Sequence, residues 1–126
     1  MPSEWERLTA EKYVLLTTFR RDGRAVPTPV WAAADGDELV VWSAREAGKV
    51  KRIRNSGEVR LQACDIRGRT HGTEIRGEAR LLDAAGTERA NKLIARKYGL
   101  VAHVTMFFSR LRGGRERSIG IGLTPA

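Results

Sequence analysis

The sequence has few of the residues that build disulfides, metal sites and nucleophilic triads. It contains one cysteine, Cys64, and two histidines, His71 and His103. A lone cysteine cannot form an internal disulfide, and neither histidine has an acidic or cysteine partner at the spacing of metal ligands. No metal site and no Ser-His-Asp arrangement is therefore predicted. If the protein is an enzyme, a cofactor must supply the chemistry.

Long apolar runs are missing as well. No stretch of about 20 apolar residues occurs, which argues against a membrane-spanning helix. The opening segment, MPSEWERLTAEKY, lacks the basic and apolar regions of a secretory signal. Together with the lone cysteine, these absences predict a cytoplasmic protein without a membrane partner.

The length of the chain, 126 residues, predicts a single domain spanning residues 1–126. A domain of this size holds a hydrophobic core but has little spare volume for a deep pocket of its own. A ligand as large as a cofactor is therefore expected at an interface between two subunits.

Positive charge is in excess over negative charge. Lysine and arginine number 23 against 15 aspartate and glutamate residues, which gives a net charge of +8. Such an excess favours anionic partners in general, namely nucleic acid, a membrane surface or phosphorylated metabolites. The composition alone does not choose among them.

Most of the chain shows the patterns of β-strands. The run YVLLTTF is apolar and β-branched, and the Asp-Gly pairs in RDGR and ADGDE predict hairpin turns. The strand between these turns carries Pro27 and Pro29, so one of its sides donates no ladder hydrogen bonds. It is therefore expected at an edge, a bulge or a barrel opening, where its backbone is left free for something other than another strand.

Further strands are predicted over residues 58–66 and 73–81 and in the closing segment RSIGIGLTP. Helices are predicted in PSEWERLTAEKY, at residues 46–55, in DAAGTERANKLIARKYGL and, more weakly, in VAHVTMFFSRLR. Six strands joined mainly by hairpins, with few helices, predict a mainly-β fold. Its antiparallel sheet is expected to close into a small barrel.

The predicted helix after Trp42 is strongly basic. Lys49 and Arg52 lie three residues apart and share one face, and Gly48 near the helix start lets a ligand approach the backbone. The amides of the first turn and the hydroxyl of Ser43 add donors at the same place. A hydroxyl, free amides, a lysine and an arginine make a complete phosphate site. A cationic surface helix with nothing bound explains this stretch equally well.

Nucleic acid is the other ligand that these charges could attract. Proteins that bind single strands combine basic residues with exposed aromatic side chains on which bases stack. Trp31 and Trp42 fall inside predicted strands, and the basic helix has no aromatic residue. Charge alone supports only weak, salt-sensitive binding, so no sequence-specific nucleic-acid partner is expected.

The segment from Lys12 to Leu82 resembles a known family. LLTTFRRDGRAVPTPVW, DGDELVVWS and GKVKRIRN leading into VRLQAC occur in the order and spacing typical of the pyridoxamine 5'-phosphate oxidase-like split β-barrel superfamily, also described as flavin-reductase-like. The closing RSIGIGLTP is similar to the last strand of that superfamily. More narrowly, the chain resembles the actinobacterial branch of oxidoreductases that use the deazaflavin coenzyme F420.

This resemblance implies a six-stranded antiparallel split β-barrel with short flanking helices, assembled as a homodimer with two cofactor sites at the interface. It implies that the phosphate of the cofactor is held by Ser43, Lys49 and Arg52, with Gly48 at the helix start and Lys51 and Arg54 as weaker candidates. It further places Thr28, Pro29, Val30 and Trp31 along the ring edge and Gln62 on the side of the partner subunit.

The resemblance also implies the chemistry. Reduced F420 would pass a hydride to a small unsaturated organic acceptor, and no residue of the sequence stands out as the catalytic proton donor. Extra cations such as Arg45, Lys51 and Arg54 suit F420, whose phosphate continues into an acidic lactyl-glutamate tail, better than FMN, which ends at its phosphate. The alternatives are an FMN-binding oxidoreductase of the same fold and a non-catalytic protein that carries the cofactor.

Overall fold

The computed structural model describes residues 4–101, 104–105 and 118–126. The helices are α1 (Glu4–Ala10), α2 (Gly48–Asn55) and α3 (Ala84–Tyr98). The strands are β1 (Tyr13–Phe19), β2 (Ala25–Val30), β3 (Ala32–Asp35), β4 (Glu38–Ala44), β5 (Glu58–Cys64), β6 (Thr70–Leu81) and β7 (Ser118–Pro125). The weak helix predicted in VAHVTMFFSRLR falls mostly outside the described residues.

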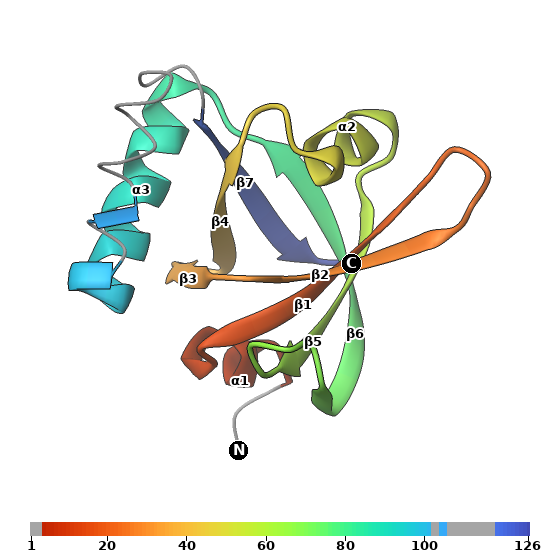
Figure 1. Cartoon of the computed structure of the whole chain (residues 1–126), viewed down its shortest axis with the longest axis horizontal. Helices are drawn as coiled ribbons and strands as arrows, with labels where there is room; N and C mark the ends of the chain where they lie inside the picture. Colours follow the sequence, from red (N-terminus) through yellow and green to blue (C-terminus); the bar gives the residue numbers. More distant parts are fainter. Residues whose placement is uncertain (1–3, 102–103, 106–117) are drawn as a thin grey trace.

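The described strands form one antiparallel sheet in the order β2-β1-β5-β6-β7-β4-β3 (Figure 1). The long strand β6 pairs with β5 and with β7, and the sheet curls around an apolar interior. Its two ends, β2 and β3, follow one another in the chain and do not pair, so the ladder is open at that point. The predicted mainly-β antiparallel split-barrel fold is confirmed, but the expected closure of the sheet is wrong for the described strands, because β2 and β3 do not pair.

The number of strands differs from the prediction, because the described part of the chain has seven rather than six. The predicted strand after the RDGR turn is divided at Trp31. Val30 is paired with Val14 of β1, whereas Ala32 is paired with Val41 of β4 at the other end of the sheet. Both halves are extended, so the local sequence pattern gives no sign that they join opposite edges.

The edge position predicted from the two prolines is confirmed, because among the described strands β2 pairs only with β1. Pro27 and Pro29 lie opposite Thr17 and Leu15 in the register. Alternate residues of a strand direct their backbone groups to opposite sides, and these two prolines share one side. The side of β2 that carries them therefore lacks N–H donors, which hinders the addition of a further strand.

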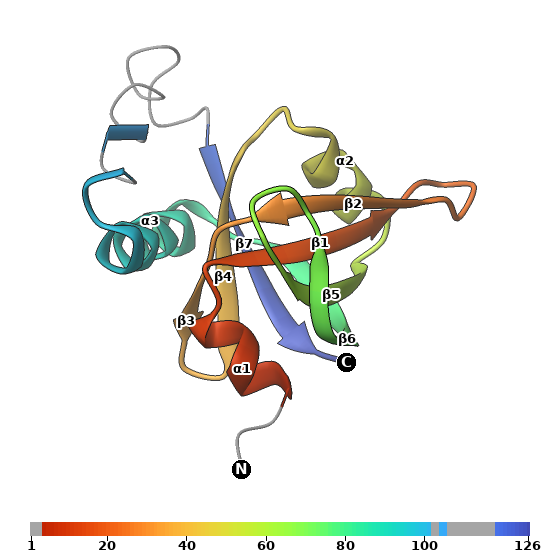
Figure 2. The same ribbon diagram turned by 60° about the horizontal axis from the view of Figure 1, so that its bottom comes forward.

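Two apolar clusters position the helices. Val50 and Ile53 of α2 are buried in the barrel interior, which confirms the predicted apolar face of this helix. α3 lies outside the sheet against β3, β4 and β7, where Ile94 packs with Val40 and with the half-buried Trp42 (Figures 1 and 2). Both views also show that the β1–β2 hairpin projects beyond the sheet on the side where α2 lies.

No helix in the described ranges is both long enough and apolar enough to cross a membrane.

Candidate functional site

The first turn of α2 presents unpaired backbone N–H groups. The preceding residue, Ala47, is extended and makes no side-chain cap, and the first turn holds no acidic residue. The N–H groups of Val50 and Lys51 both reach the carbonyl of Ala47. The N–H groups before them have no partner within the helix, and they carry the positive end of its dipole. This terminus can therefore accept an anion.

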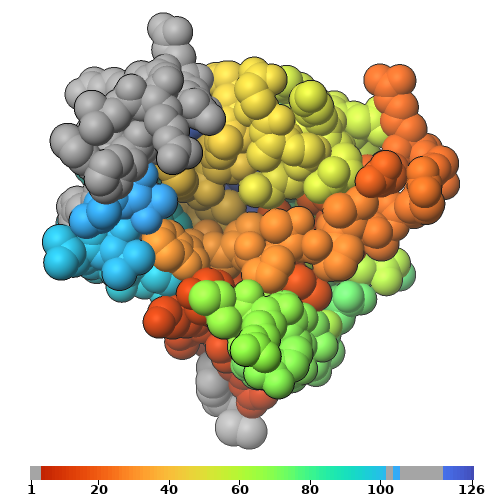
Figure 3. All heavy atoms as spheres, viewed as in Figure 1, coloured from red at the N-terminus to blue at the C-terminus, as the bar shows by residue number. Residues whose placement is uncertain are grey.

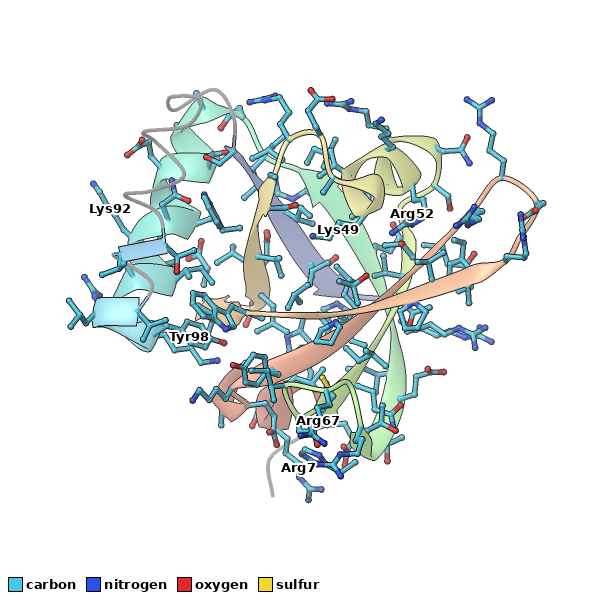
Figure 4. The ribbon with its side chains drawn as sticks, in the orientation of Figure 1. Arg7, Lys49, Arg52, Arg67, Lys92 and Tyr98 are labelled. Atoms are coloured by element: carbon cyan, nitrogen blue, oxygen red, sulfur yellow. The ribbon has the colours of Figure 1, made fainter. Side chains whose placement is uncertain are left out.

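Lys49 and Arg52 extend from α2 toward the strands beneath it (Figure 4). Lys49 is half-buried; its burial, together with the positive charge of Arg52, lowers the pKa of the ammonium group. Arg52 donates from Nε to Oγ1 of Thr18 on β1 over 2.6 Å. Burial and the charge of Arg20 lower the pKa of the guanidinium group. Two cations are thus held close together at some electrostatic cost.

No carboxylate compensates that cost within the described part of the chain. The four cations of α2 form no ion pair there. They are Lys49, Lys51, Arg52 and Arg54. Elsewhere arginines are paired, as with Asp35 and Asp65. The positive charge of α2 is therefore available to an external anion.

A cleft of about 520 Å³ lies between α2 and the β1–β2 hairpin. Phe19, Gly48 and Asn55 line it, and its other lining residues are charged. These are Arg20, Arg21, Asp22, Arg24, Lys51 and Arg52. Asp22 is paired with Arg24 over 2.8 Å, so the other cations of the cleft do not share its carboxylate. In Figure 3 the surface is also hollowed between β2–β3 and the segment from β4 to α2.

Of the residues predicted for the phosphate, the structure brings Gly48, Lys51 and Arg52 together in this cleft, and it places Lys49 beside Arg52. Ser43 is different. Its side chain is buried at the end of β4, and its hydroxyl donates to the carbonyl of Ala44 over 3.1 Å. Its role as a phosphate ligand stays a prediction and requires that this bond be exchanged.

The four residues predicted along the ring edge have different environments. Val30 is buried in the core, Thr28 is half-buried and Pro29 is exposed. Because the three side chains differ in exposure, only the backbone groups of these residues lie along the edge in common. Trp31 leaves the strand and stacks on Tyr98 of α3, with ring centroids 4.7 Å apart and planes at 11°. Contact of this segment with a cofactor ring stays a prediction.

Gln62 does not line the cleft. It lies on β5 opposite Leu15, and its amide donates to the carbonyl of Gly72 over 2.9 Å. The register between β5 and β6 shifts at this point, and the bond satisfies a carbonyl at the irregularity. This contact gives Gln62 a role within its own subunit, and its predicted role toward a partner subunit stays a prediction.

Sequence reasoning missed the residues that the hairpin contributes. Arg20, Arg21 and Arg24 flank the predicted turn, and Thr18 sits in the middle of an apolar strand pattern. Their approach to α2 depends on how β1 is placed in the sheet, which no local pattern reveals. The run RRDGR is a visible signal, because it places three arginines around one predicted hairpin turn.

The residue types that bind metals do not cluster in the described residues, which are 4–101, 104–105 and 118–126. Among those residues no three His, Cys, Asp or Glu side chains gather as ligands. Cys64 is buried, and burial raises the pKa of its thiol, which favours a structural role over a nucleophilic one. His71 faces Glu11 at 3.4 Å, away from α2.

Solved structures of low sequence identity share this fold. A conserved hypothetical protein from Mycobacterium tuberculosis is 17% identical with a TM-score of 0.73, the alignment covering 99% of this chain and 81% of that one. An F420 reductase is 17% identical with a TM-score of 0.59, over 100% and 96% of the two chains. HutZ, the heme storage protein from Vibrio cholerae, is 11% identical with a TM-score of 0.69, over 93% and 83%.

A sequence search of curated proteins gave no significant match. The family profile described as pyridoxamine 5'-phosphate oxidase, by contrast, matches residues 2–116, nearly the whole chain. The proline-bearing edge and the basic helix after β4 agree with the expectation drawn from the sequence. This chain belongs to the pyridoxamine 5'-phosphate oxidase family.

Proposed function

We propose that this protein is an oxidoreductase that binds coenzyme F420 as a homodimer and passes a hydride from the reduced cofactor to an unsaturated organic acceptor. The family includes oxidoreductases that use flavin-like cofactors, and one structural neighbour is an F420 reductase. The observation that carries the proposal is the pair Lys49 and Arg52. Both are partly buried beside an uncapped helix start, and neither has a carboxylate partner in the described part of the chain.

The residues present fit a phosphorylated ring cofactor. A phosphate placed against α2 would relieve the repulsion between Lys49 and Arg52 and would bind the free N–H groups of the first turn. The open edge at β2 offers backbone carbonyls without competing donors at Pro27 and Pro29, which suits the polar edge of a planar ring. Thr28 and Trp31 border the same edge.

The protein contributes binding, orientation and electrostatics. When bound, the reduced deazaflavin supplies the hydride. Lys49, Arg52 and the α2 amides would hold the phosphate, with Lys51 as a further cation, and the backbone of β2 would orient the ring. Thr18 holds the guanidinium of Arg52 in place through the 2.6 Å hydrogen bond. No acid in the described cleft is placed as a proton donor apart from Asp22, which is paired with Arg24, so solvent is the proposed source of the proton.

The homodimer is part of the proposal. The described cleft is open, and a domain of 126 residues has little spare volume to enclose a ligand of cofactor size by itself. A second copy would close the ring side and exclude water from the hydride. Sedimentation of the purified protein measures this state directly, and a monomer that still binds cofactor tightly would contradict it.

A parallel titration of the apo-protein with F420 and FMN tests the proposed cofactor. Tight, salt-sensitive binding of F420 and weaker binding of FMN are expected. The double variant Lys49→Ala/Arg52→Ala should weaken F420 binding by about a hundredfold, because each charge-assisted contact contributes roughly 1.5 kcal/mol. The control Lys92→Ala/Arg96→Ala removes the same charge from α3, away from α2. An unchanged affinity in the first variant would refute these two assignments.

Turnover separates an enzyme from a carrier. The F420-loaded protein is mixed with a panel of enones, quinones and tetrapyrroles, and reoxidation of the cofactor is followed by absorbance. A carrier would hold the cofactor without passing on the hydride. If the titration instead shows preferential binding of FMN, the fold and the proposed phosphate-binding residues stand, and FMN replaces F420 as the proposed cofactor.

A further inference from the structure

We infer that Lys97 is a positioning residue for the proposed cofactor site. Its ammonium group holds the break of the sheet at Trp31, and it thereby fixes the end of β2, along which the cofactor ring is proposed to lie. The inference rests on the proposed function for the role of this segment. The contacts that Lys97 makes are independent of which cofactor binds.

The break at Trp31 has no ladder bonds of its own. Val30 is paired with Val14 of β1, Ala32 is paired with Val41 of β4, and Trp31 between them belongs to neither strand. Segments with few backbone hydrogen bonds within a sheet are the ones that open most easily. Contacts from outside the sheet must therefore determine where the chain crosses from one edge to the other.

Lys97 near the end of α3 supplies three such contacts. Its Nζ donates to the carbonyl of Ala32 over 2.6 Å, to that of Glu11 over 2.7 Å and to that of Thr9 over 3.0 Å. An ammonium group has three protons, so all of its donors are used. Thr9 and Glu11 lie at the end of α1, where carbonyls lack partners within the helix. One side chain thus joins the ends of two helices to the first residue of β3.

Tyr98, the next residue of α3, holds the same place. Its hydroxyl accepts from the N–H of Ala32 at 3.0 Å, and its ring stacks on Trp31 with centroids 4.7 Å apart. The Nζ of Lys97 lies 5.2 Å from the centroid of the tyrosine ring, within the range of a cation–π contact. Both backbone polar groups of Ala32 and the side chain of Trp31 are therefore held by α3.

This contact lies apart from the proposed phosphate-binding residues. No residue of α3 lines the cleft beside α2, and Figure 4 shows Tyr98 well away from Lys49 and Arg52. We therefore expect Lys97 to act on the ring side of the site, through Trp31 and the backbone of β2. Because Lys97 is exposed as a residue, replacing its ammonium group should open no cavity in the core.

The variant Lys97→Met tests the inference in the free protein, because methionine keeps a long side chain but has no proton to donate. The tryptophan emission should shift to longer wavelength and quenching by acrylamide should increase, since Trp31 loses its fixed place. Neither change should occur in a Trp31→Phe background, which removes the reporting ring. Lys92→Met removes the same charge from the exposed surface of α3 and should change neither signal (Figure 4).

Ligand titrations separate a positioning role from a purely structural one. In Lys97→Met the affinity for F420, or for FMN if the titration favours it, should fall about fivefold, the effect of losing one net hydrogen bond. The affinity for inorganic phosphate, measured by thermal shift, should not change. In a Trp31→Ala background the same substitution should lower cofactor affinity by less than about twofold, because the ring contact through which Lys97 acts is already missing.

Equal losses for cofactor and phosphate would overturn the inference, because they would show a general loss of structure. Unchanged tryptophan emission would overturn it as well, since Trp31 would then stay fixed without Lys97. A milder variant, Lys97→Gln, retains two N–H donors and should show the same changes at smaller size, which keeps the test valid if the methionine variant does not fold.

The failure of the proposed function would look different. If the parent protein binds neither F420 nor FMN, that function is wrong, and the fluorescence of Lys97→Met decides the structural part of the inference by itself. A shift that disappears in the Trp31→Phe background supports the hold of Lys97 on the break, and no shift overturns it.

Discussion

Thr18 and Arg52 are joined by a hydrogen bond of 2.6 Å from Nε to Oγ1, although they lie 34 residues apart in the sequence. Thr18 is only 1% exposed, so its hydroxyl sits in a fixed place on β1. The bond ties the helix that holds the cations to the strand that leads into the basic hairpin. The direction of the Arg52 guanidinium is therefore set by β1 rather than by α2 alone.

Thr18→Val should weaken cofactor binding without unfolding the protein. Valine keeps the shape of threonine but cannot accept the hydrogen bond from Arg52, so the guanidinium loses its orientation. We expect a three- to tenfold loss of affinity, and a change of about 1 kcal/mol or less in the free energy of unfolding. Titration and urea denaturation measure the two effects. Thr18→Ser restores the hydroxyl and should restore affinity; if it does not, the bond is not what orients Arg52.

Gly48→Ala should act on the same guanidinium from the other side. A Cβ built at Gly48 would lie 2.8 Å from Nη1 of Arg52, so the flexible end of the arginine must move. Alanine also raises helix propensity by up to about 1 kcal/mol, so stability should hold or rise while affinity falls. In an Arg52→Ala background the substitution should leave affinity unchanged. An equal loss in both backgrounds would show that Gly48 acts without Arg52.

The elements of the fold that depend on local patterns could be predicted from the sequence. In β5 the buried residues Val59 and Leu61 alternate with more exposed ones, as the sequence pattern predicts. Pro27 and Pro29 exclude β2 from the centre of the sheet. The break at Trp31 could not be predicted, because both sides of it are extended and only the partners differ. In physical terms, strand pairing over long sequence distances is decided by the whole sheet.

The candidate site divides in the same way. Gly48 and Arg52 belong to one short helix, so their helical spacing predicts that they lie together, and they do. Arg20 joins them through the placement of β1, which no spacing encodes. Ser43 shows a second limit of prediction from sequence. Serine suits a phosphate site by residue type, but the hydroxyl of Ser43 is already hydrogen-bonded within β4.

Tyr98→Phe should lower stability because it removes an anchor at the β2–β3 junction. The hydroxyl accepts from the N–H of Ala32 at 3.0 Å and lies 2.8 Å from the carbonyl of Lys12. The carbonyl of Ala32 keeps its bond from Nζ of Lys97 at 2.6 Å, so the main loss is one buried N–H without a partner. We expect a cost of about 1–3 kcal/mol in urea denaturation.

Tyr98→Ala removes the stacked ring as well and should cost about 3 kcal/mol or more. Because the ring packs on Trp31 at 4.7 Å, the tryptophan fluorescence should shift in this variant and stay nearly unchanged in Tyr98→Phe. A shift of equal size in both variants would mean that the hydroxyl, not the stack, determines the environment of Trp31.

Lys49→Met should make the free protein more stable at neutral pH and, at the same time, less able to bind cofactor. Burial and the charge of Arg52 hold the pKa of Lys49 below its ordinary value of 10.5. Between the lowered pKa and 10.5 the unfolded chain binds more protons than the folded one, so the contribution of Lys49 to stability rises with pH. Below that window the folded state carries the full cost of the buried charge, which methionine avoids.

The stability difference between Lys49→Met and the parent should therefore be largest at neutral pH and shrink as the pH approaches 10.5. Urea denaturation at several pH values measures it, with Lys92→Met on the exposed surface of α3 as the matched control. Inorganic phosphate should narrow the same difference at neutral pH, because an anion that binds beside Lys49 stabilises only the parent. A difference that is constant with pH and insensitive to phosphate would mean that the burial of Lys49 serves packing and that its charge holds no anion.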